Sequence, residues 1–166
     1  MYIPEIPNNS LTKEITEIVQ LSQKLENEYD FVYYPPATEE EITLWENKHK
    51  IAIPESVKDW LRFSNYSNIR GELAVIRSIQ DFEIECEIMP EDLVVIGEAI
   101  GDGEFICFSK KTGKLVWEDH GDLEIYDNFN KVLKLIIDMM NENCGLSKNS
   151  ISILEAMAKK ARGGKK

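Results

Sequence analysis

The spacing of apolar residues changes twice along this chain, and this change constrains its fold more than any other feature. Over residues 11–29 the apolar positions recur every three or four residues, which is typical of an amphipathic helix. Between residues 73 and 118 they form short runs rich in β-branched and aromatic residues, which is typical of strands. From residue 126 to residue 140 the helical spacing returns, and Gly145 follows it. Helices, then strands, then a helix predict an α+β fold.

Four short apolar runs are predicted to be strands. They cover residues 73–76, 93–96, 104–108 and 114–118. Residues 109–113 join the last two runs as a hairpin, in which Gly113 supplies the left-handed residue. The apolar positions of residues 79–89 begin with helical spacing and end in alternation. This segment is therefore expected to be either an edge strand or a loop.

Two shorter helices are expected between the first helix and the first strand. Thr38 and Glu41 have the spacing of a capping box, in which each side chain bonds the backbone of the other residue. Pro54 suits the first turn of the second helix, because it lacks the N–H that a helix start leaves unused. Trp45 and Trp60 lie on the inner faces and are expected to anchor the packing of this pair.

The length of 166 residues is usual for one domain. No linker or repeat divides the chain, so we expect a single domain over residues 1–158, ending in a capped helical segment at 151–158, and a basic, flexible tail at 159–166. The three cysteines are widely spaced, and no apolar run could cross a bilayer. The N-terminus has no secretion signal. These features favour a cytoplasmic protein with reduced thiols.

Charge is unevenly distributed along the chain. The net charge is −11, but residues 159–166 hold five Lys and Arg and no acid, so residues 1–158 hold 14 bases against 30 acids. Residues 78–109 contain nine acids and no Lys or Arg, and residues 118–127 contain five more acids. Such a surface repels nucleic acid and attracts basic proteins. The alternative is an ordinary solvated surface that keeps the protein soluble.

No segment matches the motif of an enzyme. The glycine-rich residues 97–103 lack the spacing and the lysine of a nucleotide-binding loop, and their acids would repel phosphate. Residues 118–122 combine carboxylates with His120, but adjacent residues of a strand point to opposite faces. Cys107 lies between two apolar residues of a predicted strand and fits a buried thiol better than a nucleophile. We therefore expect no catalytic residue, no metal ion and no cofactor.

The order of these motifs resembles the SUKH superfamily, which contains many bacterial toxin-immunity proteins and the yeast cell-wall-assembly regulators. The matching stretches are the acidic helix start with Trp45 and then residues 51–61, followed by residues 95–117 and 129–137, and together they cover about residues 38–140. The resemblance implies a twisted, mainly antiparallel sheet of about six strands, flanked by N-terminal and C-terminal helices. The matching positions that are expected to be structural are Trp45, Pro54, Trp60, Leu61, Gly97, Gly113 and Trp117.

The resemblance also implies a non-catalytic protein-binding module, which in bacterial members commonly neutralises a cognate toxin, often a nuclease. The acidic charge of this chain agrees with a nuclease toxin as the partner, because nuclease toxins bind polyanions and tend to be basic. From charge and predicted loop exposure, the partner-binding residues are expected to be Asp102, Glu104, Glu118, Asp119, Asp122 and Glu124. The expected partner is a basic protein such as a toxin domain, with no binding of nucleic acid or membrane. The protein itself is expected to be a monomer or a weak homodimer.

Two other functions remain open at this point. The first is a regulatory or scaffold module of the same fold that is unrelated to toxins. The second is a metal-dependent hydrolase that uses Asp102, Glu118, Asp119 and His120, since carboxylates and an imidazole can hold a divalent ion.

Overall fold

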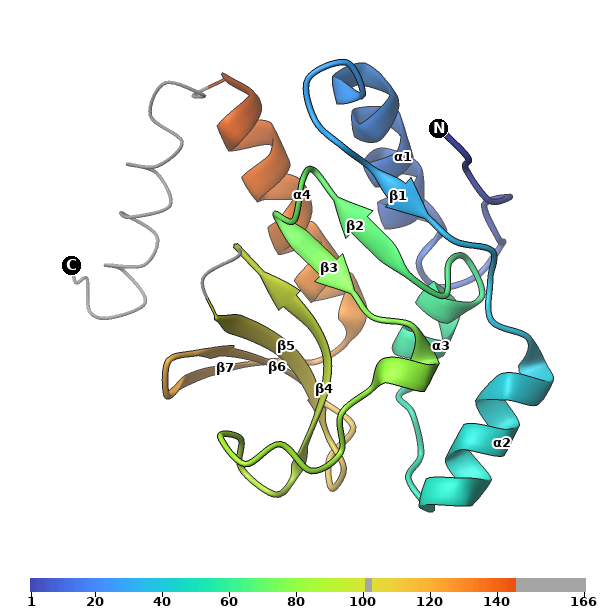
Figure 1. Ribbon diagram of the computed structural model, residues 1–166, viewed down its shortest axis with the longest axis vertical. Coiled ribbons are helices and arrows are strands. Elements are labelled where there is room, and N and C mark those ends of the chain that lie inside the picture. The colour runs from blue at the N-terminus through green and yellow to red at the C-terminus, as the bar shows by residue number, and fades with distance from the viewer. Residues whose placement is uncertain (101–102, 146–166) are drawn as a thin grey trace.

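The computed structural model describes residues 1–100 and 103–145, with side chains described as far as residue 142. These residues form four α-helices, one short 3₁₀ helix and seven strands (Figure 1). The helices are α1 (Thr12–Leu25), α2 (Glu39–His49), α3 (Glu55–Leu61), η1 (Ile79–Asp81) and α4 (Phe129–Gly145). The strands are β1 (Val32–Tyr33), β2 (Ser67–Ile69), β3 (Ala74–Ile76), β4 (Leu93–Ala99), β5 (Glu104–Ser109), β6 (Leu115–Asp119) and β7 (Asp122–Tyr126).

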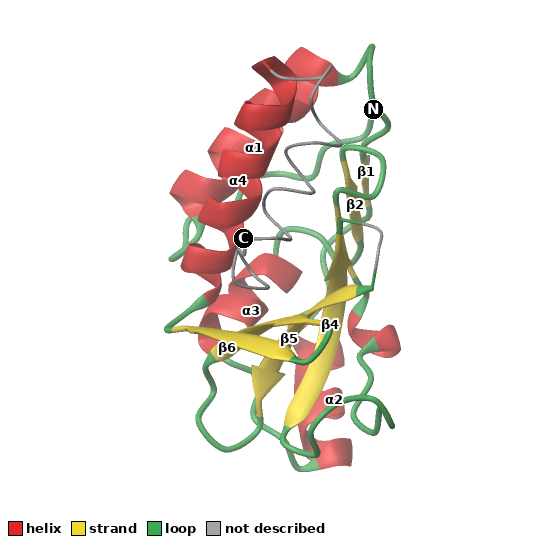
Figure 2. Cartoon of the chain, turned by 90° about the vertical axis from the view of Figure 1, so that its left-hand side faces the viewer, coloured by secondary structure: helices red, strands yellow, loops and turns green. Residues whose placement is uncertain are grey.

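The seven strands form one antiparallel sheet in which each strand pairs with the next along the chain. The predicted α+β fold with a mainly antiparallel sheet is confirmed, and the sheet has one strand more than the resemblance implied. The register of β4 shifts between Val95 and Gly97, which is a β-bulge. A bulge increases the local twist of a sheet, and Figure 2 shows the sheet strongly twisted.

The main core lies between the sheet and three helices. Alternate residues of the strands, such as Ile69, Ile76 and Ile106, pack with the apolar stripes of α1, α3 and α4. Figures 1 and 2 show α1 and α4 side by side on one side of the sheet. The opposite face carries a second, smaller core over β4–β6, which the loop of residues 83–92 helps to cover. This two-layer arrangement leaves one sheet face only partly covered.

Two segments show where sequence spacing was ambiguous. All four predicted strands are present, within β3, β4, β5 and β6. Residues 79–89 form η1 and a loop whose one β-bridge to the sheet joins Glu83 and Val95, so the loop alternative is correct. Residues 122–126 form strand β7, although Asp122 and Glu124 were expected in exposed loops and the helical spacing was expected to begin at Tyr126. The predicted helix at 151–158 and the basic tail at 159–166 lie outside the described residues, so the domain boundary stays a prediction.

The expected capping box and two of the glycines have clear structural reasons. The Glu41 N–H donates to Thr38 Oγ1 (3.0 Å), and the Thr38 N–H donates to Glu41 Oε1 (2.8 Å). A Cβ added at Gly97 would lie 2.4 Å from the Val75 carbonyl oxygen, so only glycine fits beside β3. Gly113 has φ +74°, which the β5–β6 turn requires. The other matching positions lie in or beside the core: Trp45, Trp60, Leu61 and Trp117 are buried, and Pro54 precedes α3.

Candidate protein-binding face

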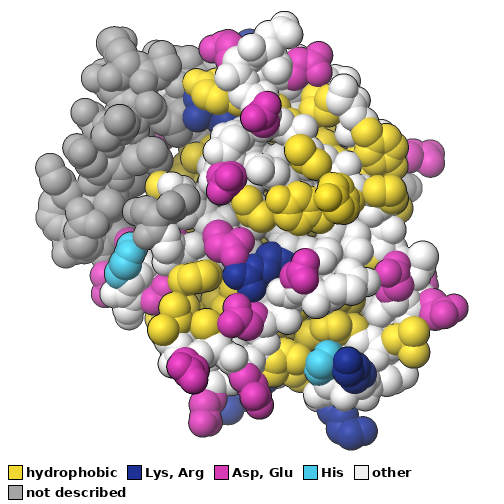
Figure 3. All heavy atoms as spheres, viewed as in Figure 1, with side chains coloured by type: hydrophobic (Ala, Val, Ile, Leu, Met, Phe, Trp, Pro, Cys, Tyr) yellow, Lys and Arg dark blue, Asp and Glu magenta, His cyan; other side chains and the backbone are white. Residues whose placement is uncertain are grey.

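The sheet face opposite α1, α3 and α4, here called the open face, carries one continuous row of side chains. The cross-strand register aligns one residue from each strand, from β1 to β7: Val32, Asn68, Val75, Glu98, Phe105, Glu118 and Leu123. At the ends of the row, Val32 is 38% and Leu123 47% exposed. Figure 3 views this side of the molecule and shows groups of hydrophobic side chains with acidic side chains around them. Exposed apolar groups gathered on one surface are typical of protein interaction sites.

A second row on the open face is covered by a loop except at its outer end. The register aligns Val95, Cys107, Val116 and Ile125. Met89, from the loop of residues 83–92, packs with the first three of these residues. Ile125 lies outside this cluster and is 66% exposed. The apolar side chains of β7 are therefore the least covered part of the second row.

Arg77 pins the loop of residues 83–92 to β4. Its Nε donates to Glu98 Oε1 (2.8 Å), and its Nη1 donates to Glu83 Oε1 (3.1 Å). Burial lowers the pKa of Arg77, but the hydrogen bonds to Glu98 and Glu83 outweigh that effect and the pKa is raised. One cation with two carboxylates leaves this cluster with a net negative charge.

A groove of about 910 Å³ lies between the same loop and the β5–β6 turn. It is lined by residues 84–87 and 89–92, together with Lys110 and Lys111. Its acidic lining residues are Glu85, Glu87, Glu91 and Asp92. Asp92 is held in place by the Ser109 hydroxyl and by the Lys111 N–H (3.0 Å). Four carboxylates against two lysines make the groove acidic, so it suits basic side chains.

Five of the six predicted partner-binding carboxylates lie in strands instead of loops, and three of these five are buried. Glu104, Glu118 and Asp119 are only 4%, 6% and 5% exposed. Glu104 and Asp119 are cross-strand partners in β5 and β6, and the Trp117 Nε1–H donates to Glu104 Oε1 (2.7 Å). The expectation of loop exposure was wrong for these three residues, because strand pairing and nearby donors allow carboxylates to be buried. Their contact with a partner stays a prediction.

The tight turn between β6 and β7 contains polar contacts of two of the predicted carboxylates, Glu118 and Asp119. The Gly121 N–H donates to Glu118 Oε2 (2.6 Å), and His120 Nδ1 lies 2.7 Å from Asp119 Oδ1. Glu118 belongs to the open face, whereas Asp119 is on the opposite face with the core residue Trp117. Among the described residues of the hydrolase alternative, Glu118 and Asp119 therefore do not converge. Among the described residues, no group of three or more His, Cys, Asp and Glu could hold a metal ion.

Asp122 and Glu124 are exposed, as expected. Both side chains lie on the side of β7 opposite Leu123, because neighbouring residues of a strand alternate. Asp102 lies outside the described residues. The described members of the predicted set thus divide between two faces, with Glu118 on the open face and the others on the opposite face.

Sequence reasoning missed the apolar contribution of β7. Residues 122–126 read acid, Leu, acid, Ile, Tyr, and this strict alternation could have predicted a strand with Leu123 and Ile125 on one face. The density of acids suggested a loop instead.

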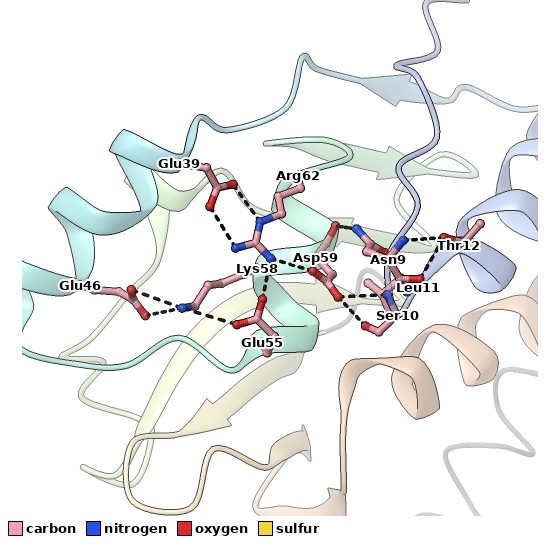
Figure 4. Close-up of polar contacts among 10 residues, drawn as sticks. All are labelled: Asn9, Ser10, Leu11, Thr12, Glu39, Glu46, Glu55, Lys58, Asp59 and Arg62. Carbon is pink, nitrogen blue, oxygen red and sulfur yellow. Dashed lines mark hydrogen bonds and ion pairs between the residues drawn. The ribbon is translucent and has the colours of Figure 1, made fainter.

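A second cluster of charges has a structural role (Figure 4). Arg62 Nε and Nη2 donate to the two carboxylate oxygens of Glu39 (2.8 and 3.0 Å), and Nη1 donates to Glu55 (2.6 Å) and Asp59 (2.8 Å). Asp59 also accepts from the Ser10 hydroxyl (2.5 Å). The hydrogen bond to Glu39 is the main cause that raises the pKa of Arg62. The cluster joins α2, α3 and the start of α1, and its charges are engaged within the protein.

Comparisons with known proteins agree with the fold. None of the described helices has the length and apolar character needed to span a membrane. A search of curated proteins finds no match to this sequence. The model of the SMI1 / KNR4 family (SUKH-1) matches residues 36–135, a span from the connector before α2 into α4. The chain therefore belongs to the SMI1 / KNR4 family (SUKH-1), whose domains are protein-interaction modules of the immunity or regulatory type and are generally non-enzymatic.

Proposed function

We propose that this protein is an immunity protein, which binds a cognate toxin domain in the cytoplasm and neutralises it without catalysis. The observation that carries the proposal is the open face, which combines exposed apolar side chains at Leu123 and Ile125 with an acidic surround. Apolar contacts supply affinity in protein complexes, and complementary charge supplies orientation and speed of association.

The charge of the protein supports a basic partner. Residues 1–158 hold 30 acids and 14 bases. Two of the few cations near the open face, Arg77 and Lys114, are each paired with carboxylates of this chain. A basic toxin domain would meet a surface whose excess charge is negative over both the groove and β7.

The proposal that binding is non-catalytic is supported by two features of the described residues. Glu118 and Asp119 lie on opposite faces of the sheet, so they cannot act on one substrate atom. Burial raises the pKa of the Cys107 thiol to about 12, which keeps it protonated and unreactive near neutral pH.

The test of neutralisation is co-expression with a candidate toxin domain taken from a neighbouring gene. We expect cells that express the toxin domain to survive only when the protein is present, and the purified pair to form a complex that weakens as salt is raised. Equal death of toxin-expressing cells with and without the protein, or no complex at low salt, would contradict an immunity function. A housekeeping partner recovered in place of a toxin would favour the regulatory or scaffold alternative.

A further inference from the structure

Strand β7 is an open edge of the sheet. It pairs with β6 on one side, and it is the last strand in the sheet order (Figure 1). Four of its five residues are exposed, and Tyr126 is half-buried. None of the described residues forms a backbone hydrogen bond to the outer side of this strand. An edge of this kind can pair with another strand.

The turn before β7 determines which backbone groups point outward. His120 and Gly121 both have positive φ, at 51° and 103°, as in a two-residue hairpin turn. Such a turn makes Asp119 and Asp122 the first hydrogen-bonded pair, and pairs then alternate along the ladder. Glu124 therefore bonds to β6, and the N–H and C=O groups of Leu123 point away from the sheet. The same alternation directs the backbone groups of Ile125 outward.

The side chains of β7 differ between its two faces. Leu123 and Ile125 place apolar groups, 47% and 66% exposed, on the open face. Asp122 and Glu124 place carboxylates on the other face. No Lys, Arg or Pro occurs in residues 115–130, so the charged side chains of the edge are carboxylates, which oppose an acidic strand and favour a basic one.

We propose that β7 binds an extended strand of a basic partner protein, and that this strand alternates apolar with basic side chains. Its backbone would bond to Leu123 and Ile125, its apolar side chains would lie beside theirs, and its Lys or Arg side chains would lie beside Asp122 and Glu124. Opposite charges on facing strands stabilise pairing. This inference deepens the proposed function, because it names how a basic partner would be bound.

A second copy of this chain fits the same edge poorly. Antiparallel pairing of two β7 strands that aligns Leu123 with Leu123 or Ile125 of the other copy places Glu124 opposite Asp122 or Glu124. Like charges directly opposite each other destabilise a strand pair. In these two registers, the alternation of β7 favours a basic strand over a second copy of this chain.

The probe for this inference is a seven-residue peptide of alternating lysine and valine, blocked at both ends, titrated into the isotope-labelled full chain. We expect the amide signals of Leu123 and Ile125 to shift most, and their exchange with solvent to slow. Ile125→Lys should weaken peptide binding at least fivefold, because it adds a repelling charge. The matched control is Leu44→Lys in α2, where the apolar side chain is 59% exposed and lies outside the open face, and it should leave affinity unchanged.

Two further experiments test whether the peptide pairs with the backbone of β7. Ile125→Pro removes an outward N–H but no bond to β6, so it should weaken binding, whereas Ile125→Thr should retain most of it. A peptide methylated on alternate backbone nitrogens should not bind. Equal binding of the methylated peptide, no shift at β7, or shifts confined to residues 84–92 would overturn the proposal. So would a wild-type dimer that Leu123→Lys converts to a monomer.

Failure of this inference is distinguishable from failure of the proposed function. If the cognate toxin domain binds wild-type protein and Ile125→Lys equally well and the peptide does not bind, edge pairing is wrong and the immunity function stands. If the peptide binds at β7 but no toxin is neutralised, the edge is a binding site and the immunity function is wrong.

Discussion

At the scale of single residues, glycine is found where two backbone segments lie close together. Carboxylates are buried where a nearby side chain donates a hydrogen bond to them. Gly97 lies against the Val75 carbonyl, and Glu104 accepts from the Trp117 indole. Sequence matching singled out Gly97 and Trp117 without giving this reason. The burial of Glu104 depends on a partner 13 residues away, so the local sequence gave no indication of it.

Gly97→Ala should lower the free energy of unfolding by at least about 2 kcal/mol, because the new Cβ would lie 2.4 Å from a backbone oxygen that cannot move freely. Gly113→Ala is the matched control. No atom lies within 4 Å of a Cβ at Gly113, and its positive φ alone should cost about 1 kcal/mol. Urea unfolding of both variants gives the comparison. Equal losses of unfolding free energy in the two variants would contradict a steric clash between the new Cβ and the Val75 carbonyl oxygen.

Cys107 should resist thiol reagents in the native protein. Burial raises its pKa to about 12, so the thiolate is scarce at pH 8, whereas Cys86 is half-buried at the surface of the same small core. In a Cys144→Ser background, Cys86 should react quickly with the reagent. Cys107 should react only after the protein unfolds. Two fast thiols at pH 8 would mean that the loop of residues 83–92 opens readily.

At the scale of helices and strands, sequence spacing predicted the elements with strong periodicity and missed those stabilised by pairing. The strands at 73–76, 93–96, 104–108 and 114–118 were evident from their apolar runs. β1 has two residues and β2 has three, so neither offers a readable pattern, and they exist because they pair with each other and with β3. Strand β7 was not predicted, because the density of acidic residues in it indicated a loop. The open face could not be predicted either, because it follows from the register of all seven strands.

Arg62 should contribute to stability by joining α2 to α3. Arg62→Ala should cost about 1–3 kcal/mol, since it leaves the buried carboxylate of Asp59 without its cation. The hydrogen bond to Arg62 lowers the pKa of Glu39 from its ordinary value of 4.5. A lowered carboxyl pKa gives stability that is present above pH 4.5 and lost as the pH falls through the folded-state pKa.

The measurement is unfolding of wild type and Arg62→Ala between pH 7 and pH 3. The difference between them should narrow below about pH 4, as Glu39 takes up a proton. The control is Lys134→Ala, whose ion pair with Asp138 is exposed and should contribute little at any pH. A difference that stays constant to pH 3 would contradict a role for the Glu39 carboxylate.

At the scale of the whole molecule, a helical layer supports a sheet that has one partly covered face and an exposed edge strand, β7. The described helices cover the sheet from one side, so the other described residues leave the open face, the acidic groove and β7 exposed. The fold class could be predicted from periodicity and the family from the order of motifs. The division of the acids into buried and exposed groups required the three-dimensional pairing of β5, β6 and β7.

The most direct measurement of the central claim is the association rate of the cognate toxin domain at low and high salt. It compares wild type with Asp122→Lys/Glu124→Lys and with Glu26→Lys/Glu28→Lys, a control that reverses two exposed acids at the end of α1. If β7 attracts a basic partner, the β7 variant should associate at least tenfold more slowly at low salt, the control should differ far less, and the differences should shrink in high salt. Equal rates for the wild type and the β7 variant, with no dependence on salt, would contradict the claim.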